Sequence, residues 1–310
     1  MNIRHLTHEQ IDKTQWDFVI ESSPNSVIYA YSWFLDSLCA GWEALMVGDY
    51  EIIMPIPIKR MFGFKLAYKP LYIQRLGFFS IQRITSEITF AFLEATLKHF
   101  HYVTYSLALN NIDSIPKQFS IHQRKNYTLD LSNSYELISA NYTKDARRSL
   151  KNNVGISWII DKDYESVISN FAACYGDLFQ MKDKNTNLFR AAIAKADAQE
   201  RLIGFSVFRD NQKIASALFF FCNETVFYLL GAPTPEHKKR NATHFLIDEF
   251  IKQYAQKFKV LDFEGSDIPS VAYFYQKWGS RNEGYFQLAG SRSSVLAKLF
   301  EWKNYLCSKI

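Results

Sequence analysis

Two carboxylates lie two residues apart in the segment LDFEGSDIPSVAYFYQKWG, residues 261–279. We expect a short strand over residues 259–263, and two positions on a strand place Asp262 and Glu264 on one face and Phe263 on the other. Because carboxylates are costly to bury, this pair indicates either a general base or a ligand for a substrate amine. The alternative is structural, with one acid capping a helix and the other paired with a lysine.

A basic cluster follows a predicted strand in the segment LLGAPTPEHKKRNATH, residues 229–244. The cluster comprises Lys238, Lys239, Arg240 and Asn241 and precedes a predicted helix. Backbone N–H groups at a helix N-terminus, with cations beside them, suit a phosphate or pyrophosphate group. A solvated charged loop is the plainer interpretation.

Two further polar patches are candidates for substrate contacts. Lys144, Arg147, Arg148 and Lys151 have the spacing i, i+3, i+4 and i+7, which concentrates their charge on one helix face. Such a stripe suits an anionic substrate or an RNA backbone, or is simply solvated. In the other patch, Gln74 and its neighbour Arg75 interrupt an apolar strand, so at least one of them needs a polar partner.

The elements that must position these residues occur in the same order twice. Each half is predicted to contain antiparallel strands followed by a helix that crosses to another strand, which predicts two α+β domains of related architecture, residues 1–120 and 121–310. In the first half we expect helices over 7–22, 31–38 and 86–100 and strands over 42–47, 52–58, 65–68, 72–76 and 102–109. In the second half we expect helices over 134–142, 144–152, 164–175, 187–199, 242–258 and 269–278 and strands over 127–131, 156–160, 201–208, 214–221, 226–230, 259–263 and 285–288.

Composition narrows the class of protein. The 310 residues are 48% hydrophobic and carry a net charge of +5, a bias too small to indicate nucleic-acid binding by itself. The four cysteines have no CxxC spacing, so we expect no metal site and no disulfide framework. The first ten residues lack the apolar core of a secretory signal, and no apolar stretch approaches the ~20 residues of a membrane helix. We therefore expect a cytoplasmic protein.

The basic helix and the acidic strand with its glycine turn and aromatic helix together resemble the FemABX family. The stretches PIPIKRMFG, residues 55–63, and PLYIQRLGFF, residues 70–79, also resemble FemAB-like proteins described as acetyltransferase-like. The resemblance implies two tandem domains of the acyl-CoA N-acyltransferase (GNAT) fold, each a mixed, mostly antiparallel sheet flanked by helices. It also implies transfer of an acyl or aminoacyl group to an amine.

The sequence departs from the family in two places. Members that build peptidoglycan bridges commonly carry a Phe-Lys pair in the closing helix, where this sequence has Phe274-Tyr275, with Lys277 three positions after the Phe. Acetyl-CoA enzymes have small residues in their phosphate loop where this sequence has Ala242 and His244, and we expect the histidine to obstruct close approach of a phosphate.

The sequence therefore predicts an N-acyltransferase. We expect Asp262 or Glu264 to be the base, Tyr228 and Tyr275 to be candidate proton donors, and Lys238, Lys239, Arg240 and Asn241 to contact the donor's phosphates. Gln74, Arg147 and Arg148 would contact the acceptor, a small molecule or a cell-wall precursor. The donor would be acyl-CoA or aminoacyl-tRNA. Two alternatives stay open: tRNA-dependent aminoacyl transfer to a peptidoglycan precursor, and a non-catalytic binding module with a degenerate GNAT fold.

Overall fold

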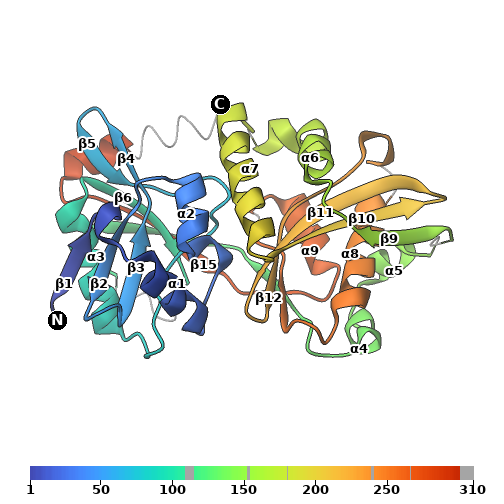
Figure 1. Cartoon of the computed structure of the whole chain (residues 1–310), viewed down its shortest axis with the longest axis horizontal. Helices are drawn as coiled ribbons and strands as arrows, with labels where there is room; N and C mark the ends of the chain where they lie inside the picture. Colours follow the sequence, from blue (N-terminus) through green and yellow to red (C-terminus); the bar gives the residue numbers. More distant parts are fainter. Residues whose placement is uncertain (109–114, 152–153, 180, 239–240, 266, 301–310) are drawn as a thin grey trace. The chain divides into compact units, whose positions relative to one another are not determined.

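The computed structural model describes the chain except for residues 109–114, 152–153, 180, 239–240, 266 and 301–310 (Figure 1). The chain forms two compact units. Unit 1 comprises residues 1–124 and the chain from residue 285 onward, and unit 2 comprises residues 125–284. Each unit has sheets flanked by helices, which confirms the predicted α+β class.

The division of the chain differs from two consecutive halves at residues 1–120 and 121–310. Strand β15 (Tyr285–Gly290) lies between β6 (Tyr102–Leu107) and β7 (Phe119–Arg124) and pairs antiparallel with both. Because of these hydrogen bonds, β15 belongs to unit 1 although it follows unit 2 in the sequence. Only the central part of the second half, residues 125–284, forms unit 2.

Unit 1 contains a three-stranded sheet of order β1-β2-β3 and a five-stranded sheet of order β4-β5-β6-β15-β7. Isolated bridges join the two sheets through one short segment, since Leu76 pairs with Leu107 and Phe79 pairs with Ile53. The predicted strand over residues 72–76 is wrong, because Tyr72 takes a left-handed conformation (φ 65°) and only Leu76 forms a bridge. The other elements of unit 1 are β1 (Ile3–Leu6), η1 (His8–Gln10), α1 (Lys13–Ser22), η2 (Ile28–Ala30), α2 (Ser32–Leu38), β2 (Glu43–Val47), β3 (Ile52–Ile56), β4 (Ile58–Met61), β5 (Phe64–Ala67) and α3 (Ser86–His99).

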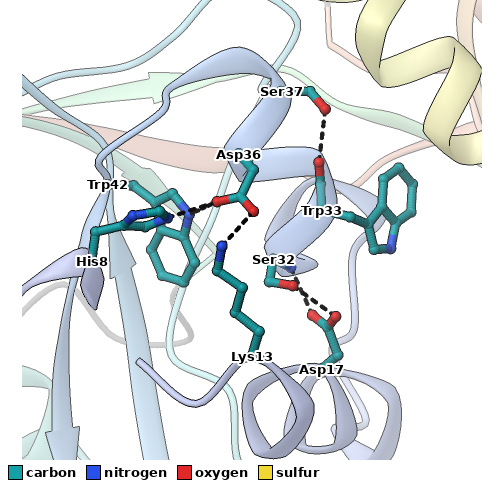
Figure 2. Close-up of polar contacts among 8 residues, drawn as sticks. All are labelled: His8, Lys13, Asp17, Ser32, Trp33, Asp36, Ser37 and Trp42. Atoms are coloured by element: carbon teal, nitrogen blue, oxygen red, sulfur yellow. Dashed lines mark hydrogen bonds and ion pairs between the residues drawn. The ribbon is translucent and has the colours of Figure 1, made fainter. Parts of the chain in front are cut away.

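A polar network centred on Asp36 fixes the N-terminal helices of unit 1 (Figure 2). Its carboxylate accepts hydrogen bonds from His8 Nε2 (2.8 Å), Lys13 Nζ (2.7 Å) and Trp42 Nε1 (3.0 Å). Burial raises the pKa of Asp36, but these three donors outweigh it and hold the pKa below its usual range. Because three donors engage the carboxylate, we assign this network a structural role and not a catalytic one.

Unit 2 contains one seven-stranded sheet of order β14-β8-β13-β12-β11-β10-β9. Its strand pairs are antiparallel except for β12 and β13, which run parallel. The elements are β8 (Tyr127–Asp130), α4 (Tyr135–Ser139), α5 (Lys144–Ser149), β9 (Ile156–Ile160), α6 (Tyr164–Phe179), α7 (Asp183–Ala198), β10 (Leu202–Arg209), β11 (Gln212–Cys222), β12 (Thr225–Pro233), η4 (Pro235–His237), α8 (Ala242–Tyr254), β13 (Val260–Asp262), α9 (Pro269–Gln276) and β14 (Arg281–Asn282).

Helices cover both faces of this sheet. On one face, Phe250 of α8 stacks on Phe219 of β11, with ring centroids 3.5 Å apart. The next residue of β11, Phe220, points to the opposite face and contacts Phe189 of α7. No helix among the described residues is long and apolar enough to cross a membrane.

Candidate active site

The parallel strands β12 and β13 stay paired over only three residues each, from Thr225↔Val260 to Phe227↔Asp262. A β-bulge follows directly in β12, because Leu218 of β11 pairs with Leu230 whereas Phe219 pairs with Tyr228, which leaves Leu229 as the extra residue. A bulge bends its strand and re-aims nearby side chains. The predicted acidic residues and Tyr228 therefore lie where the two strands part.

Asp262 is the last residue of β13 and is 1% exposed. Its Oδ1 accepts a hydrogen bond from the backbone N–H of Glu264 (2.8 Å), and its Oδ2 accepts one from Asn126 Nδ2 (3.3 Å). Glu264 lies beyond the strand in a left-handed conformation (φ 68°). The prediction that both acids share one strand face is therefore wrong, and Asp262 instead holds the backbone of Glu264 in its turn.

Burial dominates the electrostatics of the Glu264 side chain. Its Oε1 atom is buried and has no hydrogen-bond partner among the described residues. Burial raises the pKa of this carboxyl well above its ordinary value, because the charged form loses its hydration. A carboxyl in this state holds its proton more tightly than an exposed glutamate, as general acids and bases of enzymes do.

Aromatic rings surround this acidic turn. Tyr275 of α9 stacks on Phe263 with centroids 5.1 Å apart, and Tyr228 of β12 meets Tyr275 edge-on at 6.4 Å. Burial raises the pKa of both tyrosines, and for Tyr275 the negative charge of Glu264 raises it further. Both hydroxyls are therefore protonated at neutral pH, as a proton donor must be.

Sequence reasoning missed two residues near this turn. Tyr175 of α6 lies close enough that its negative form would raise the pKa of Tyr228 and Tyr275. Asn126 is 1% exposed and holds Asp262, as described above. An amphipathic helix gives no sign of which tyrosine faces a site, and a lone Asn before a strand carries no spacing pattern.

The predicted phosphate loop is described only in part, since Lys239 and Arg240 lie outside the described residues. Lys238 Nζ donates a hydrogen bond to the carbonyl oxygen of Cys174 (2.5 Å) and lies 5.1 Å from the ring centroid of Tyr175. Asn241 precedes α8 in a left-handed conformation (φ 57°).

His244, in the first turn of α8, packs into unit 2. Its ring contacts Phe274 (5.0 Å) and Trp278 (5.8 Å), and its Nε2 lies 3.2 Å from Lys277 Nζ. Burial, reinforced by the charge of Lys277, lowers the pKa of His244 to about 4. Lys277 in turn forms an ion pair with Asp145 of α5 (2.7 Å), so the lysine links three helices.

The basic helix α5 engages its own neighbours. Arg147 donates hydrogen bonds to the carbonyl oxygens of Ala140 (3.0 Å) and Tyr142 (2.6 Å), just after α4. Arg148 is mostly exposed and pairs with Asp145 (2.8 Å). The structure thus gives Arg147 a local structural role and leaves Arg148 at the surface.

Gln74 lies in unit 1, where it is buried and its Oε1 accepts a hydrogen bond from Arg75. The predicted site residues are therefore divided between units, with Asp262, Glu264, Tyr228 and Tyr275 gathered in unit 2. In the part of the chain that the structure describes, no group of three or more His, Cys, Asp or Glu side chains could hold a metal ion.

No protein-family model matches this sequence, and no curated protein matches it. Solved structures do match its fold. A crystal structure of FemX has a TM-score of 0.68 at 13% identity, over 93% of this chain and 97% of that one. The C-terminal domain (DUF2156) of a putative lysylphosphatidylglycerol synthetase from Agrobacterium fabrum has a TM-score of 0.61 at 9% identity, over 94% and 95%.

A third match is L-PGS from Bacillus licheniformis, with a TM-score of 0.59 at 9% identity, over 96% of this chain and 97% of that one. Each match covers nearly the whole of both chains and so includes both units. The chain therefore shares the fold of FemX, in keeping with its resemblance to the FemABX family.

Proposed function

We propose that this protein is an N-acyltransferase that moves an acyl or aminoacyl group from an activated donor to a substrate amine. The observation that carries the proposal is the buried carboxyl oxygen of Glu264 where β12 and β13 part, since it has no hydrogen-bond partner in the part of the chain that the structure describes. The fold shared with FemX supports the same reaction class.

In the proposed reaction, the amine nitrogen attacks the carbonyl carbon of a thioester or ester. A C–N bond forms, and the bond from that carbon to the sulfur or oxygen of the leaving group breaks. Glu264 accepts the proton that the amine loses, and Tyr228 or Tyr275 donates one to the leaving group. An exposed glutamate, with a pKa of about 4.3, is a weak base near neutral pH, and the raised pKa of Glu264 makes its carboxylate stronger.

Asp262 has a positioning role in this proposal. It fixes the backbone N–H of Glu264, and Asn126 fixes Asp262 in turn. The backbone that carries Glu264 is then held in one conformation before the substrate binds, which favours preorganised catalysis.

The proposed donors, acyl-CoA and aminoacyl-tRNA, both carry phosphate. Lys238, Asn241 and the first turn of α8 are the described candidates for contacts with it, and Lys239 and Arg240 complete the predicted loop. The inward packing of the His244 ring on Phe274 and Trp278 supports this site, because a side chain directed there does not cover the loop. Arg148 and Gln74 stay candidates for the acceptor, whereas backbone carbonyls engage Arg147.

The test is transfer measured by mass spectrometry, with acetyl-CoA, longer acyl-CoAs and aminoacyl-tRNA offered as donors to a panel of amines. Replacing Glu264 with Gln should lower the rate by about 100-fold or more, the usual effect of losing a base. Exposed Glu283 in the same unit supplies the matched control, and Glu283→Gln should leave the rate unchanged. An unchanged rate in Glu264→Gln would refute the assignment of the base.

The donors also separate the two alternatives. If aminoacyl-tRNA is the donor, binding should weaken steeply as salt rises, because phosphate contacts release counterions. If the protein is a non-catalytic module, no donor should be consumed, and no acyl-CoA or tRNA should raise the melting temperature. That last result would overturn the proposal.

A further inference from the structure

The seven-stranded sheet of unit 2 has two different borders. At one border, β14 has only two residues, both of them polar and exposed. At the other border, β9 spans five residues, has no charged residue and no proline, and pairs with β10 without a bulge. Among the described residues, no strand pairs with β9 on the side away from β10 (Figure 1). Charges, prolines and bulges are the usual features that keep edge strands from pairing with other chains, and β9 has none of them.

The backbone groups of β9 alternate between β10 and this open edge. Asp161, directly after β9, donates its backbone N–H to the carbonyl oxygen of Gly204 in β10 (3.0 Å). In an antiparallel pair every second residue bonds to the neighbouring strand, so the odd-numbered residues of β9 face β10. The N–H and C=O groups of Ile156, Trp158 and Ile160 therefore point to the open edge.

The side chains of β9 add apolar surface along the same edge. Ile159 and Ile160 point to opposite faces of the sheet, and they are 46% and 59% exposed. The ring of Trp158 stacks on Phe205 of β10, with centroids 5.4 Å apart, which ties the middle of β9 to the sheet. A strand added beside β9 would cover apolar side chains on both faces.

We propose that the open edge of β9 pairs with β9 of a second copy of this chain. An antiparallel pair centred on Trp158 places Trp158 opposite its own counterpart and Ile156 opposite Ile160 of the second copy. In this register all three residues that point to the edge exchange N–H···O=C bonds with a facing residue. The two sheets become one continuous sheet. Because each copy has one β9, the contact closes as a two-fold dimer.

The charges that flank β9 favour a second copy as the partner. Residues 144–151, before the strand, hold four cations and one acid, and residues 161–165, after it, hold three acids and one lysine. Antiparallel pairing brings the segment before one β9 towards the segment after the other. Net positive charge therefore approaches net negative charge at both ends of the pair. A partner with one sign of charge throughout, such as RNA, would be repelled at one end.

The first measurement is the mass of the whole protein by sedimentation equilibrium over a wide range of concentration. We expect association that depends on concentration and ends at twice the 36.1 kDa of one chain. Ile160→Lys should weaken this association by roughly tenfold or more, because it brings a charge against Ile156 of the second copy. Ile81→Lys, at an apolar residue of unit 1 that is 72% exposed, is the matched control and should leave the association unchanged.

Paired cysteines test the register. Ser157 faces Ile159 of the second copy in a pair without hydrogen bonds, whose Cα atoms lie about 4.5 Å apart, within the ~4.4–6.8 Å of disulfides. Cys307 lies outside the described residues and is first replaced with serine, whereas the other cysteines are buried. In this background, mixed Ser157→Cys and Ile159→Cys chains should form a mixed disulfide on mild oxidation. Either variant alone should form far less, because identical positions lie diagonally, about 7–8 Å apart.

A chain that stays monomeric at every concentration would overturn the proposal, and so would a dimer that Ile160→Lys leaves intact. Equal cross-linking in the mixture and in the single variants would contradict the register, and assemblies that grow beyond a dimer would contradict the two-fold closure. Three strands separate β9 from β13, so the dimer does not depend on the proposed acyl transfer. Glu264→Gln should therefore dimerise as the unchanged protein does.

Discussion

The ring of Tyr228 occupies the space where a side chain at Gly231 would stand. A Cβ atom on Gly231 would lie 2.2 Å from the Tyr228 hydroxyl oxygen and 2.5 Å from Cε2. The bulge at Leu229 lies between the two residues and bends β12 so that the tyrosine folds back along its own strand. Gly231 is thus required by the position of a proposed proton donor rather than by its own backbone angles.

We expect Gly231→Ala to destabilise the protein by about 1–3 kcal/mol, because overpacking a buried site forces neighbours to move. Urea unfolding measures the change. Gly176 in α6 is the matched control, since a Cβ there meets nothing within 4 Å, and Gly176→Ala should stabilise the helix by about 0.5–1 kcal/mol. If the two alanine variants had equal stability, the packing of Tyr228 over Gly231 would be wrong.

The raised pKa of Glu264 predicts a pH-dependent stability. An acid whose pKa is higher in the folded chain binds more protons there, so this contribution to stability falls as pH rises from about 4.3 towards the folded pKa. Relative to Glu264→Gln, the unchanged protein should lose up to about 1.4 kcal/mol per pH unit in this window. Urea midpoints measured from pH 4 to pH 8 check the difference, and parallel curves for the two proteins would contradict it.

His244 should stay neutral at pH values well below the ordinary pKa of a histidine. Burial and Lys277 lower its pKa to about 4, so its ring signals in NMR should titrate near pH 4. Lys277→Met should raise this pKa, because the like charge is removed. Lys144→Met, at an exposed lysine of α5, should leave it in place. Titration of His244 near its ordinary value of 6.5 would show that its ring is not packed as described.

The adjacent arginines of α5 should differ in their effect on stability. Arg147 bonds two backbone carbonyls after α4, and we expect Arg147→Ala to cost about 1 kcal/mol of unfolding free energy. Arg148 makes one exposed ion pair, and Arg148→Ala should lower the unfolding free energy by at most a few tenths of a kcal/mol. Urea unfolding of both variants measures the two losses, and equal losses would argue against a stabilising role for the bonds from Arg147 to the two carbonyls.

The fold could be predicted from sequence where the hydrophobic pattern agrees with the turn and capping residues at the ends of an element. Helix α3 matches its predicted range to within one residue, and Gly48-Asp49 marks the β2–β3 hairpin. Strands that owe their existence to distant partners were missed. Strand β1 pairs with β2 across about 40 residues of chain, and the mostly exposed β7 is held by β15.

The candidate site also combines features that are local in the sequence with features that depend on distant residues. The acidic pair stands out because its chemistry is local to three residues, and the structure keeps Asp262 and Glu264 together. Their different tasks depend on where β13 ends and on Asn126, which is 136 positions away along the chain from Asp262.

The position of β15 between β6 and β7 has a consequence for synthesis. Unit 2 is continuous in sequence, so a growing chain holds all of it once residue 284 has been made. Unit 1 begins first but lacks the strand that both β6 and β7 pair with until residue 290 leaves the ribosome. Domains usually fold in the order in which they are synthesised. Here the later unit can complete its sheet first, and the earlier one must wait with two open strand edges.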